Sequence, residues 1–268
     1  MTDLFSLHGK TAIVTGALGL IGRKHCEALA NAGANVIVAD RDECAVEQFA
    51  RHLGNSHLGI VIDVTSKESV TVACEAILHQ YDTIDILVNN AAINDMFENP
   101  AMAKELSAFE NYPLDAFQKS LDVNITGVFL CSQVFGSVMA EQGSGSIINV
   151  ASTYGMVGPD QSIYRNECGE QTFYKSAAYP VTKGAVINFT RFLAAYWGNK
   201  GVRVNTLSPG GVENNQSENF IQKYAAKTPL GRMAQANDYQ GALVYLASDA
   251  SAYMTGANLV VDGGWTAI

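Results

Sequence analysis

Short β-branched, apolar runs alternate with longer segments of helical periodicity along most of the chain. The strand-like runs cover residues 10–14, 35–39, 58–62, 85–88, 146–150, 202–207 and 258–261. The helical patterns cover residues 22–30, 66–80, 114–138, 184–197 and 239–246. This alternation predicts an α/β fold in which a parallel, doubly wound sheet of about seven strands carries helices on both faces.

Three segments interrupt the alternation. Residues 93–113 predict a loop with a short helix, and residues 155–178 form a polar segment that we expect to be too polar for the core. Residues 213–236 are polar and helix-prone, and they predict a mobile flap over a binding site. Because no linker separates these segments, we expect all 268 residues to form one domain.

The first strand-like run ends in a glycine-rich turn, Thr15-Gly-Ala-Leu-Gly-Leu-Ile-Gly22, which leads into a helix. Strand, glycine turn and helix in this order are typical of a Rossmann-like dinucleotide-binding unit. The first glycine permits the tight turn, the second lets the backbone approach a pyrophosphate, and the third lets the helix pack closely on the strand. The expected phosphate contacts, at the N-terminus of the helix, are Gly16, Gly19, Leu20 and Ile21.

Asp40 closes the second strand-like run, eighteen residues after Gly22. A carboxylate at this place accepts hydrogen bonds from both adenosine ribose hydroxyls and repels a 2′-phosphate, which favours NAD over NADP. Arg41 follows directly, and it can either stack on adenine or soften that repulsion. Asp40 can also serve as a helix cap, but its spacing from the glycine turn favours the cofactor role.

Residues at the ends of later strand-like runs extend the predicted cofactor site. Asp63 and Val64 lie where an adenine amino group is read, and the small residues of Asn90-Ala91-Ala92 let the chain pass beneath the ribose. The asparagine amides there can tie neighbouring strands together. After the sixth run, a Pro-Gly-Gly turn is expected near the cofactor's carboxamide, through Pro209, Gly210 and Val212.

Tyr179 and Lys183 stand four residues apart at the head of the helical run 184–197. On a helix this spacing places both side chains on one face, about one turn apart. The ordinary pKa of tyrosine is about 10, and a neighbouring ammonium lowers it. A phenolate near neutral pH requires about 4 kcal/mol, more than an exposed ion pair supplies. A desolvated pocket and a second positive charge, such as an oxidised nicotinamide, are therefore required.

Two further polar residues fall at informative positions. Ser152 follows the fifth strand-like run, at the end of the sheet where ligands bind in open α/β folds, and can polarise a carbonyl. Asn124 lies in the apolar middle of the predicted helix 114–138. A buried asparagine must find partners, so Asn124 either holds an ordered water or disturbs the helix locally.

Composition and charge exclude several classes of partner. The formal charge is −9 without a basic run, which argues against nucleic acid. No apolar run approaches the length of a membrane span, and the start of the chain lacks the pattern of a signal peptide, so we expect a soluble, cytoplasmic protein. The five cysteines lack CxxC spacing, which suits reduced thiols. The five histidines do not group at metal-ligand spacing, and we expect no metal.

Taken in order, these residues resemble the short-chain dehydrogenase/reductase family along nearly the whole chain. The resemblance is carried by the glycine turn, Asp40, Asp63, Asn90-Ala91-Ala92, Asn124, Ser152, Tyr179-x-x-x-Lys183, Pro209-Gly210 and Val261-Asp262-Gly263-Gly264. It implies an NAD-dependent oxidoreductase acting between alcohols and ketones. It also implies a homo-oligomer, a tetramer or dimer, assembled through the helices that start near Leu114 and Tyr179 and the C-terminal strand region.

The resemblance further implies four catalytic roles. Tyr179 would exchange a proton with the substrate oxygen, and Lys183 would lower the pKa of Tyr179 and hold the nicotinamide ribose. Ser152 would bind the carbonyl or hydroxyl, and Asn124 would fix a water in a relay to Lys183. Hydride transfer itself is the chemistry of the cofactor.

The chain departs from the family pattern in three places. Leu20 takes the place of a glycine, as in the longer epimerase and dehydratase branch, although the length leaves no separate substrate domain. Asn214 stands where a threonine commonly contacts the cofactor. The separation of Ser152 and Tyr179 is about twice the usual one, so residues 155–178 are expected to form substrate-site structure.

The polar residues expected around the substrate suit a hydroxyl-rich or anionic ligand such as a sugar, polyol or sugar acid. The expected contacts are Tyr154, Tyr164, Arg165 and Asn214. A weaker similarity links the chain to oxidoreductases associated with bacterial surface-sugar and nonulosonic-acid pathways. Two other interpretations remain open: an NAD-using sugar epimerase or dehydratase, and a non-catalytic NAD-binding sensor.

Overall fold

The computed structural model describes residues 4–94 and 100–268. Within these residues, seven parallel strands form one sheet in the order β3-β2-β1-β4-β5-β6-β7. They are β1 (Thr11–Thr15), β2 (Asn35–Asp40), β3 (Leu58–Val61), β4 (Ile86–Asn89), β5 (Gly145–Val150), β6 (Val202–Pro209) and β7 (Asn258–Val261). The predicted Rossmann-like, doubly wound sheet is confirmed, with strand bounds shifted by one or two residues.

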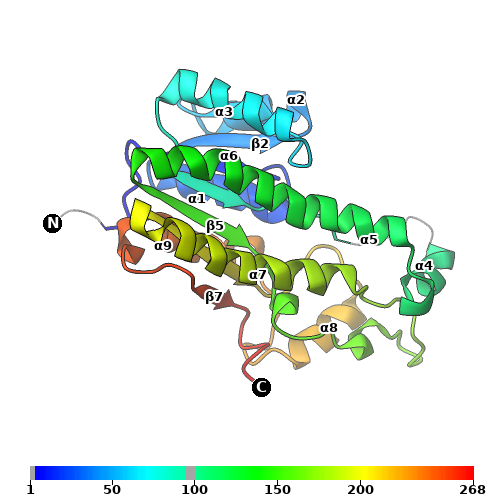
Figure 1. Cartoon of the computed structure of the whole chain (residues 1–268). Coiled ribbons are helices and arrows are strands. Elements are labelled where there is room, and N and C mark those ends of the chain that lie inside the picture. The colour runs from blue at the N-terminus through cyan, green and yellow to red at the C-terminus, as the bar shows by residue number, and fades with distance from the viewer. Residues whose placement is uncertain (1–3, 95–99) are drawn as a thin grey trace.

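Helices cover both faces of this sheet (Figure 1). The helices on one face are α1 (Leu20–Asn31), α2 (Glu43–Leu53) and α9 (Gln240–Ala247). The helices on the other face are α3 (Lys67–Tyr81), α6 (Gly127–Gln142) and α7 (Ala178–Trp197). Successive strand residues point to opposite faces, so Ala12 and Val14 join the first core and Ile13 the second. Since both faces are buried, the strands are mainly apolar.

Helix α2 was not among the predicted helices. Its start is nevertheless marked in the sequence, because the Asp42 carboxylate accepts a hydrogen bond from the Ala45 backbone N–H at 3.0 Å. Val46 and Phe49 lie three residues apart and are buried against the sheet. The crossover from β2 to β3 is therefore an ordinary amphipathic helix.

The predicted helix 114–138 is a longer rod that is interrupted once. It consists of α5 (Leu114–Leu121), a π-helical turn (Asp122–Thr126) and α6, and Figure 1 shows α5 and α6 running end to end. Asn124 lies in the π turn, which agrees with the second of the two alternatives predicted for it, a local disturbance of the helix. The rod is long and apolar enough to cross a membrane, but half of its most apolar window is buried within the protein. The packing of α6 on the sheet and α3 accounts for that apolarity.

Part of the insertion at residues 155–178 is buried among apolar side chains, although the sequence of the segment is polar. It contains a 3-10 turn (Gln161–Tyr164) and one isolated bridge. Ile163 is buried against Tyr224 of α8 (Glu218–Ala226), Met233 and Trp265. The expectation that this segment is too polar for burial is wrong, because α8 and the C-terminal turn supply apolar partners distant in sequence.

The segment predicted as a loop with a short helix is described only in part. Residues 95–99 of that prediction lie outside the described residues. The part that follows contains α4 (Pro100–Ser107) and a 3-10 turn (Phe109–Asn111), which confirms the short helix.

A buried row of amides and hydroxyls fixes α6 and α7 to the sheet. The side-chain N–H₂ of Asn89 donates to Asn149 Oδ1 at 2.8 Å on the neighbouring strand, and to Ser132 Oγ of α6 at 3.1 Å. The side-chain N–H₂ of Asn149 donates to Thr190 Oγ1 of α7 at 2.9 Å, and Thr206 Oγ1 donates to the same hydroxyl at 2.8 Å. These residues are almost fully buried, so their mutual hydrogen bonds define one register of both helices.

We expect Asn149→Ala to lower the free energy of unfolding by about 2 to 3 kcal/mol, because it leaves buried polar groups without partners. Urea denaturation followed by circular dichroism measures this loss. Ser137→Ala is the matched control, since that hydroxyl donates to the Gln133 carbonyl on the exposed side of α6 and its loss should cost about 0.5 kcal/mol or less. Equal losses for the two variants would contradict the stabilising role of the row.

Candidate active site

A cavity of about 690 Å³ opens at the carboxyl ends of the strands. In a doubly wound sheet this edge, near the point where the strand order reverses between β1 and β4, is where ligands bind. The predicted site residues that line the cavity are Gly16, Gly19, Leu20, Ile21, Asp40, Arg41, Asp63, Val64, Asn90, Ala91, Ala92, Tyr179, Lys183 and Pro209.

The glycine turn forms one wall of the cavity and has no room for side chains at two positions. Gly16 has φ +61°, and a Cβ there would come within 2.7 Å of the Ala91 Cα. A Cβ on Gly22 would lie 2.2 Å from the Gly16 carbonyl oxygen. Helix α1 begins directly after Gly19 without a side-chain cap, and its first turn lines the cavity. The unsatisfied N–H groups and the positive helix end suit a phosphate.

Two carboxylates border the same cavity at the ends of β2 and β3. Asp40 accepts hydrogen bonds from the backbone N–H of Leu18 at 3.0 Å and of Arg41 at 2.8 Å. The Asp63 carboxylate accepts from the hydroxyl and the N–H of Thr65, and these bonds hold its pKa below the usual value. The cavity wall is therefore anionic on this side, with the Arg41 guanidinium beside it.

Asn90 joins the end of β4 to the glycine turn. Its side-chain N–H₂ donates to the carbonyls of Thr15 and Gly16, each at 3.0 Å. The Thr15 hydroxyl accepts from the backbone N–H groups of Asn90 and Ala91, each at 3.1 Å. The prediction that asparagine amides tie neighbouring strands together is confirmed.

Asn124 connects three parts of the structure. Its Oδ1 accepts from the Ile93 N–H at 2.8 Å, and its N–H₂ donates to the Ile93 carbonyl at 3.0 Å and to Thr182 Oγ1 at 3.2 Å. The side chain thus holds the chain after β4 against α7, and its polar atoms are occupied by protein partners. A water relay through Asn124 stays a prediction.

Ser152, Tyr179 and Lys183 meet at the end of β5. Ser152 is buried two residues after β5 and forms a side-chain hydrogen bond with Tyr179. Lys183 follows one turn later on α7, with its ammonium 5.7 Å from the centre of the Tyr179 ring. The Lys183 ammonium donates to the Val150 carbonyl at 2.7 Å. The helix therefore places the phenol and the ammonium on one face, as the four-residue spacing predicts.

Burial shifts the pKa of both groups toward their neutral forms. It raises the pKa of Tyr179, and the hydrogen bond from Ser152 only partly offsets it. Burial also lowers the pKa of Lys183 to about 8. Lys183 was expected to lower the pKa of Tyr179. The net shift of that pKa is upward, because desolvation of the phenolate is the larger effect.

A family model described as Enoyl-(Acyl carrier protein) reductase matches residues 16–266. The matched range includes most of the glycine turn and all of Ser152, Tyr179 and Lys183. The chain belongs to the short-chain dehydrogenase/reductase family.

The similar members of the short-chain dehydrogenase/reductase family include enzymes named for polyols and sugar acids. D-threitol dehydrogenase of Mycolicibacterium smegmatis is 37% identical over 98% of this chain and 95% of its own length. Galactitol 2-dehydrogenase (L-tagatose-forming) of Cereibacter sphaeroides is 35% identical over 98% of this chain and 97% of its own. A gluconate 5-dehydrogenase from Burkholderia cenocepacia, solved with NADP and tartrate, superposes with a TM-score of 0.86 at 32% identity, covering 99% of this chain and 98% of that one.

Two predicted cofactor contacts of this short-chain dehydrogenase/reductase do not line the cavity. Gly210 donates its N–H to the Val261 carbonyl at 2.9 Å, and its own carbonyl accepts from the Tyr239 hydroxyl at 3.1 Å. Val212 forms an isolated bridge with Ala234. The turn after β6 is therefore held against β7 and the flap, and only Pro209 reaches the cavity.

The predicted substrate contacts divide into two pairs. The hydroxyls of Tyr154 and Tyr164 lie 3.5 Å apart, and each phenol has a weak electrostatic interaction with Tyr179. Burial raises the pKa of Tyr164 to about 12 and that of Tyr154 further. Arg165 is exposed and donates to Gln171 Oε1 at 3.3 Å, and Asn214 is exposed on the flap. The two tyrosines therefore lie within electrostatic range of Tyr179, whereas Arg165 and Asn214 are exposed to solvent.

Lys175 is a residue of this site that sequence reasoning missed. It is buried, and its ammonium lies 4.4 Å from the centre of the Tyr179 ring. It stands four residues before Tyr179, the same spacing at which Lys183 follows. That spacing was the available signal, but Lys175 precedes helix α7, so helical geometry alone does not predict its position.

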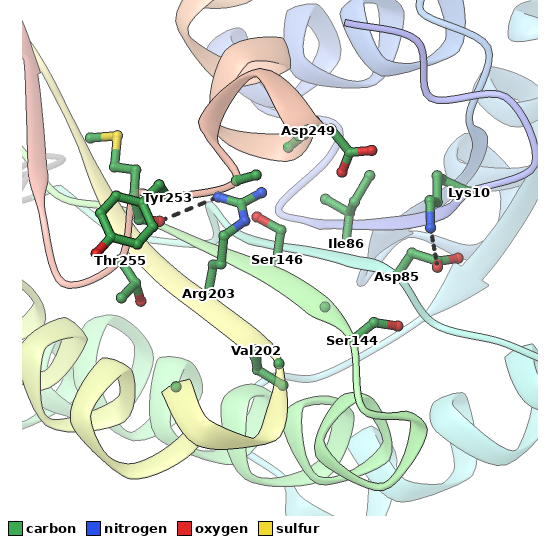
Figure 2. A pocket seen from close by; sticks show the side chains of 16 residues that line it. Lys10, Asp85, Ile86, Ser144, Ser146, Val202, Arg203, Asp249, Tyr253 and Thr255 are labelled. Carbon is green, nitrogen blue, oxygen red and sulfur yellow. Dashed lines mark hydrogen bonds and ion pairs between the residues drawn. The ribbon is translucent and has the colours of Figure 1, made fainter. Parts of the chain in front are cut away.

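A separate cavity of about 540 Å³ lies at the opposite, amino ends of β4, β5 and β6 (Figure 2). Three of its charged groups, Lys10, Asp85 and Arg203, have protein partners. The Lys10 ammonium donates to the Asp85 carboxylate at 3.1 Å. The Arg203 guanidinium donates to the Ser251 hydroxyl and the Leu246 carbonyl, each at 2.9 Å. The candidate active site is therefore the cavity at the carboxyl ends.

Proposed function

We propose that this protein interconverts a secondary alcohol and a ketone by hydride transfer with NAD(P), preferring NAD, on a sugar, polyol or sugar acid. The observation that carries this proposal is that Tyr179 and Lys183 line the cavity that the glycine turn borders, with Ser152 beside Tyr179. The polyol and sugar-acid names of similar enzymes support the substrate class.

The residues of the cavity fit a nicotinamide dinucleotide. The glycine turn and the first turn of α1 would hold the pyrophosphate, Asp40 the adenosine ribose, and Asp63 the adenine. When bound, the nicotinamide supplies the site that accepts or gives the hydride. An oxidised nicotinamide also carries the second positive charge that a buried Tyr179 phenolate requires.

The remaining roles belong to the protein's own side chains. Tyr179 exchanges a proton with the substrate oxygen, and Ser152 holds that oxygen through the hydroxyl that it now directs at Tyr179. Lys183 supplies positive charge from a position fixed by the Val150 carbonyl. Tyr154 and Tyr164 present phenol hydroxyls to a hydroxyl-rich substrate.

The insertion at residues 155–178 and the flap at 213–236 shape the substrate end of a single domain in this proposal. Their shared apolar cluster of Ile163, Tyr224, Met233 and Trp265 supports that role. The five cysteines are free thiols, which agrees with the cytoplasmic location that we propose.

Incubating the protein with polyols and sugar acids and either NAD or NADP, while following absorbance of the reduced nicotinamide, tests the function. We expect turnover with at least one of these substrates. Binding of NAD without turnover of any of them would favour the sensor interpretation, and a product epimerised without net reduction of NAD would favour the epimerase.

Tyr179→Phe should lower kcat by about a thousandfold or more, because it removes the proton-exchanging oxygen and keeps the ring. The dissociation constant for NAD, measured by calorimetry, should change little. Near wild-type turnover in this variant would contradict the role of Tyr179.

Asp40→Ala should lower the ratio of kcat/KM for NAD to that for NADP by about tenfold or more, because the repulsion of a 2′-phosphate is removed. Asp42→Ala is the matched control, since Asp42 lies on the same loop but caps α2. If both variants kept the wild-type ratio, Asp40 would not be the discriminating residue.

We also propose that the protein is a homo-oligomer, a tetramer or a dimer. An exposed aromatic stripe supports this: Phe192 and Tyr196 of α7 are 58% and 60% exposed, and their rings stack 5.8 Å apart. Phe129 of the adjacent α6 is 44% exposed. Burial of this stripe against a second copy would remove apolar surface from water.

Replacing Phe192 and Tyr196 together with glutamate should reduce the molar mass measured by light scattering to that of a smaller assembly, because two charges cannot be buried in an apolar contact. Val72→Glu on α3 is the control, since Val72 is similarly exposed at 58% but lies away from the stripe. An unchanged mass in the double variant would exclude this stripe as the contact.

A further inference from the structure

Lys175 reaches Tyr179 from a part of the chain that lies outside helix α7. Its side chain is 7% exposed, and its ammonium is nearer to the centre of the Tyr179 ring than that of Lys183, at 4.4 Å against 5.7 Å. The ammonium also donates to Asn94 Oδ1, on the segment that follows β4 at the wall of the cofactor cavity. The side chain of Lys175 therefore connects the insertion to the cavity wall and to Tyr179.

The backbone of Lys175 is fixed in place by a single side chain. The N–H of Lys175 donates to Gln161 Oε1 at 2.9 Å, and the N–H₂ of Gln161 donates to the Lys175 carbonyl at 2.9 Å. Gln161 belongs to the 3-10 turn that carries Ile163 into the apolar cluster with α8. The position of the ammonium is thus set by the packing of the insertion.

Titratable and charged groups approach Tyr179 from several elements. Lys183 of α7 and Lys175 of the insertion contact the Tyr179 ring. Tyr154 and Tyr164 of the 3-10 turns interact with Tyr179 electrostatically. Lys119 of α5 and Asp122 of the π turn line the same cavity. Lys119 is exposed, so water screens its charge, whereas both contacting lysines are buried. The two buried ammonium groups are therefore the main local source of positive potential on the phenol.

We propose that Lys175 is a positioning residue that acts through Tyr179: its ammonium stabilises the phenolate and thereby sets the pH at which Tyr179 accepts a proton from the substrate. The ammonium lies within 6 Å of the ring, where a cation is attracted to an aromatic side chain, and the negative charge of the phenolate strengthens that attraction. The effect of Lys175 on catalysis rests on the proposed function, whereas its effect on the ionisation of Tyr179 does not.

The size of the effect follows from the distance and the burial. An opposite charge within about 4 to 6 Å changes the acidity of a group by about one to three pH units. Removing the ammonium should therefore raise the ionisation midpoint of Tyr179 by about one unit or more. Below the midpoint, kcat/KM for alcohol oxidation should fall by about tenfold.

The test is an ultraviolet titration of tyrosinate in the full-length protein, with and without NAD, from neutral pH to about pH 11. The Tyr179→Phe protein serves as the blank, so the difference spectrum reports Tyr179. With NAD bound, we expect a higher midpoint in Lys175→Met than in the wild type, or no ionisation of Tyr179 within the range. We expect a midpoint restored close to the wild-type value in Lys175→Arg, which keeps the charge.

Lys223→Met is the matched control for loosening of the insertion. Its ammonium donates to the Arg165 carbonyl at 2.6 Å, so its loss disturbs the same segment without removing charge beside Tyr179. We expect an unchanged midpoint in this variant. A shift as large as that of Lys175→Met would show that packing of the insertion, and not charge, controls Tyr179, and would overturn the proposal.

Two other outcomes also overturn it: equal midpoints in the wild type and Lys175→Met with NAD bound, and a wild-type Tyr179 that stays a phenol through the whole range with NAD bound. If the substrate screen finds no turnover, the proposed function fails, but the titration still decides the role of Lys175. With a substrate in hand, a changed KM without a shifted pH profile would mark Lys175 as a substrate contact instead.

Discussion

The burial of a phenol and an ammonium side by side is the constraint on which this site depends. Burial favours the neutral form of each group, raising the pKa of Tyr179 and lowering that of Lys183 to about 8. A tyrosine that takes a proton near neutral pH therefore needs positive potential from its surroundings. The nearby sources are the two lysines and, in the proposed function, an oxidised nicotinamide. Helix α7 and the insertion place the two ammonium groups beside the Tyr179 ring.

The fold fixes that arrangement with buried polar contacts that lie close to the site. The row from Asn89 to Thr206 sets the register of α6 and α7 on the sheet. Asn124 holds the chain after β4 against Thr182, three residues after Tyr179. Because most of the polar groups in these contacts are buried and hydrogen-bonded, a displaced helix would leave several polar atoms unpaired. Small movements of Tyr179 relative to the cavity are therefore costly.

The sequence predicted those parts of the site that depend on local geometry. A glycine turn between a strand and a helix, a carboxylate at the end of β2, and a tyrosine and lysine four residues apart are each determined by short segments. For Asn124 the sequence left two alternatives, an ordered water or a local disturbance, and the π turn agrees with the second. The comparison with known families then supports the reaction class, which no single motif establishes.

The parts that depend on distant packing were not predicted. Lys175 reaches Tyr179 because Gln161 and the cluster around Trp265 fix the insertion, and none of these contacts is visible in the spacing of residues. Gly210 and Val212 were assigned to the cofactor, yet their backbones are engaged by β7 and Ala234.

The most direct test of the whole account is turnover of a polyol that carries deuterium on all its carbons, followed by mass spectrometry of the nicotinamide. The account predicts one deuterium in the reduced cofactor, transferred from the oxidised carbon. Reduced cofactor without deuterium, or deuterium lost to water without reduction of the cofactor, would contradict it.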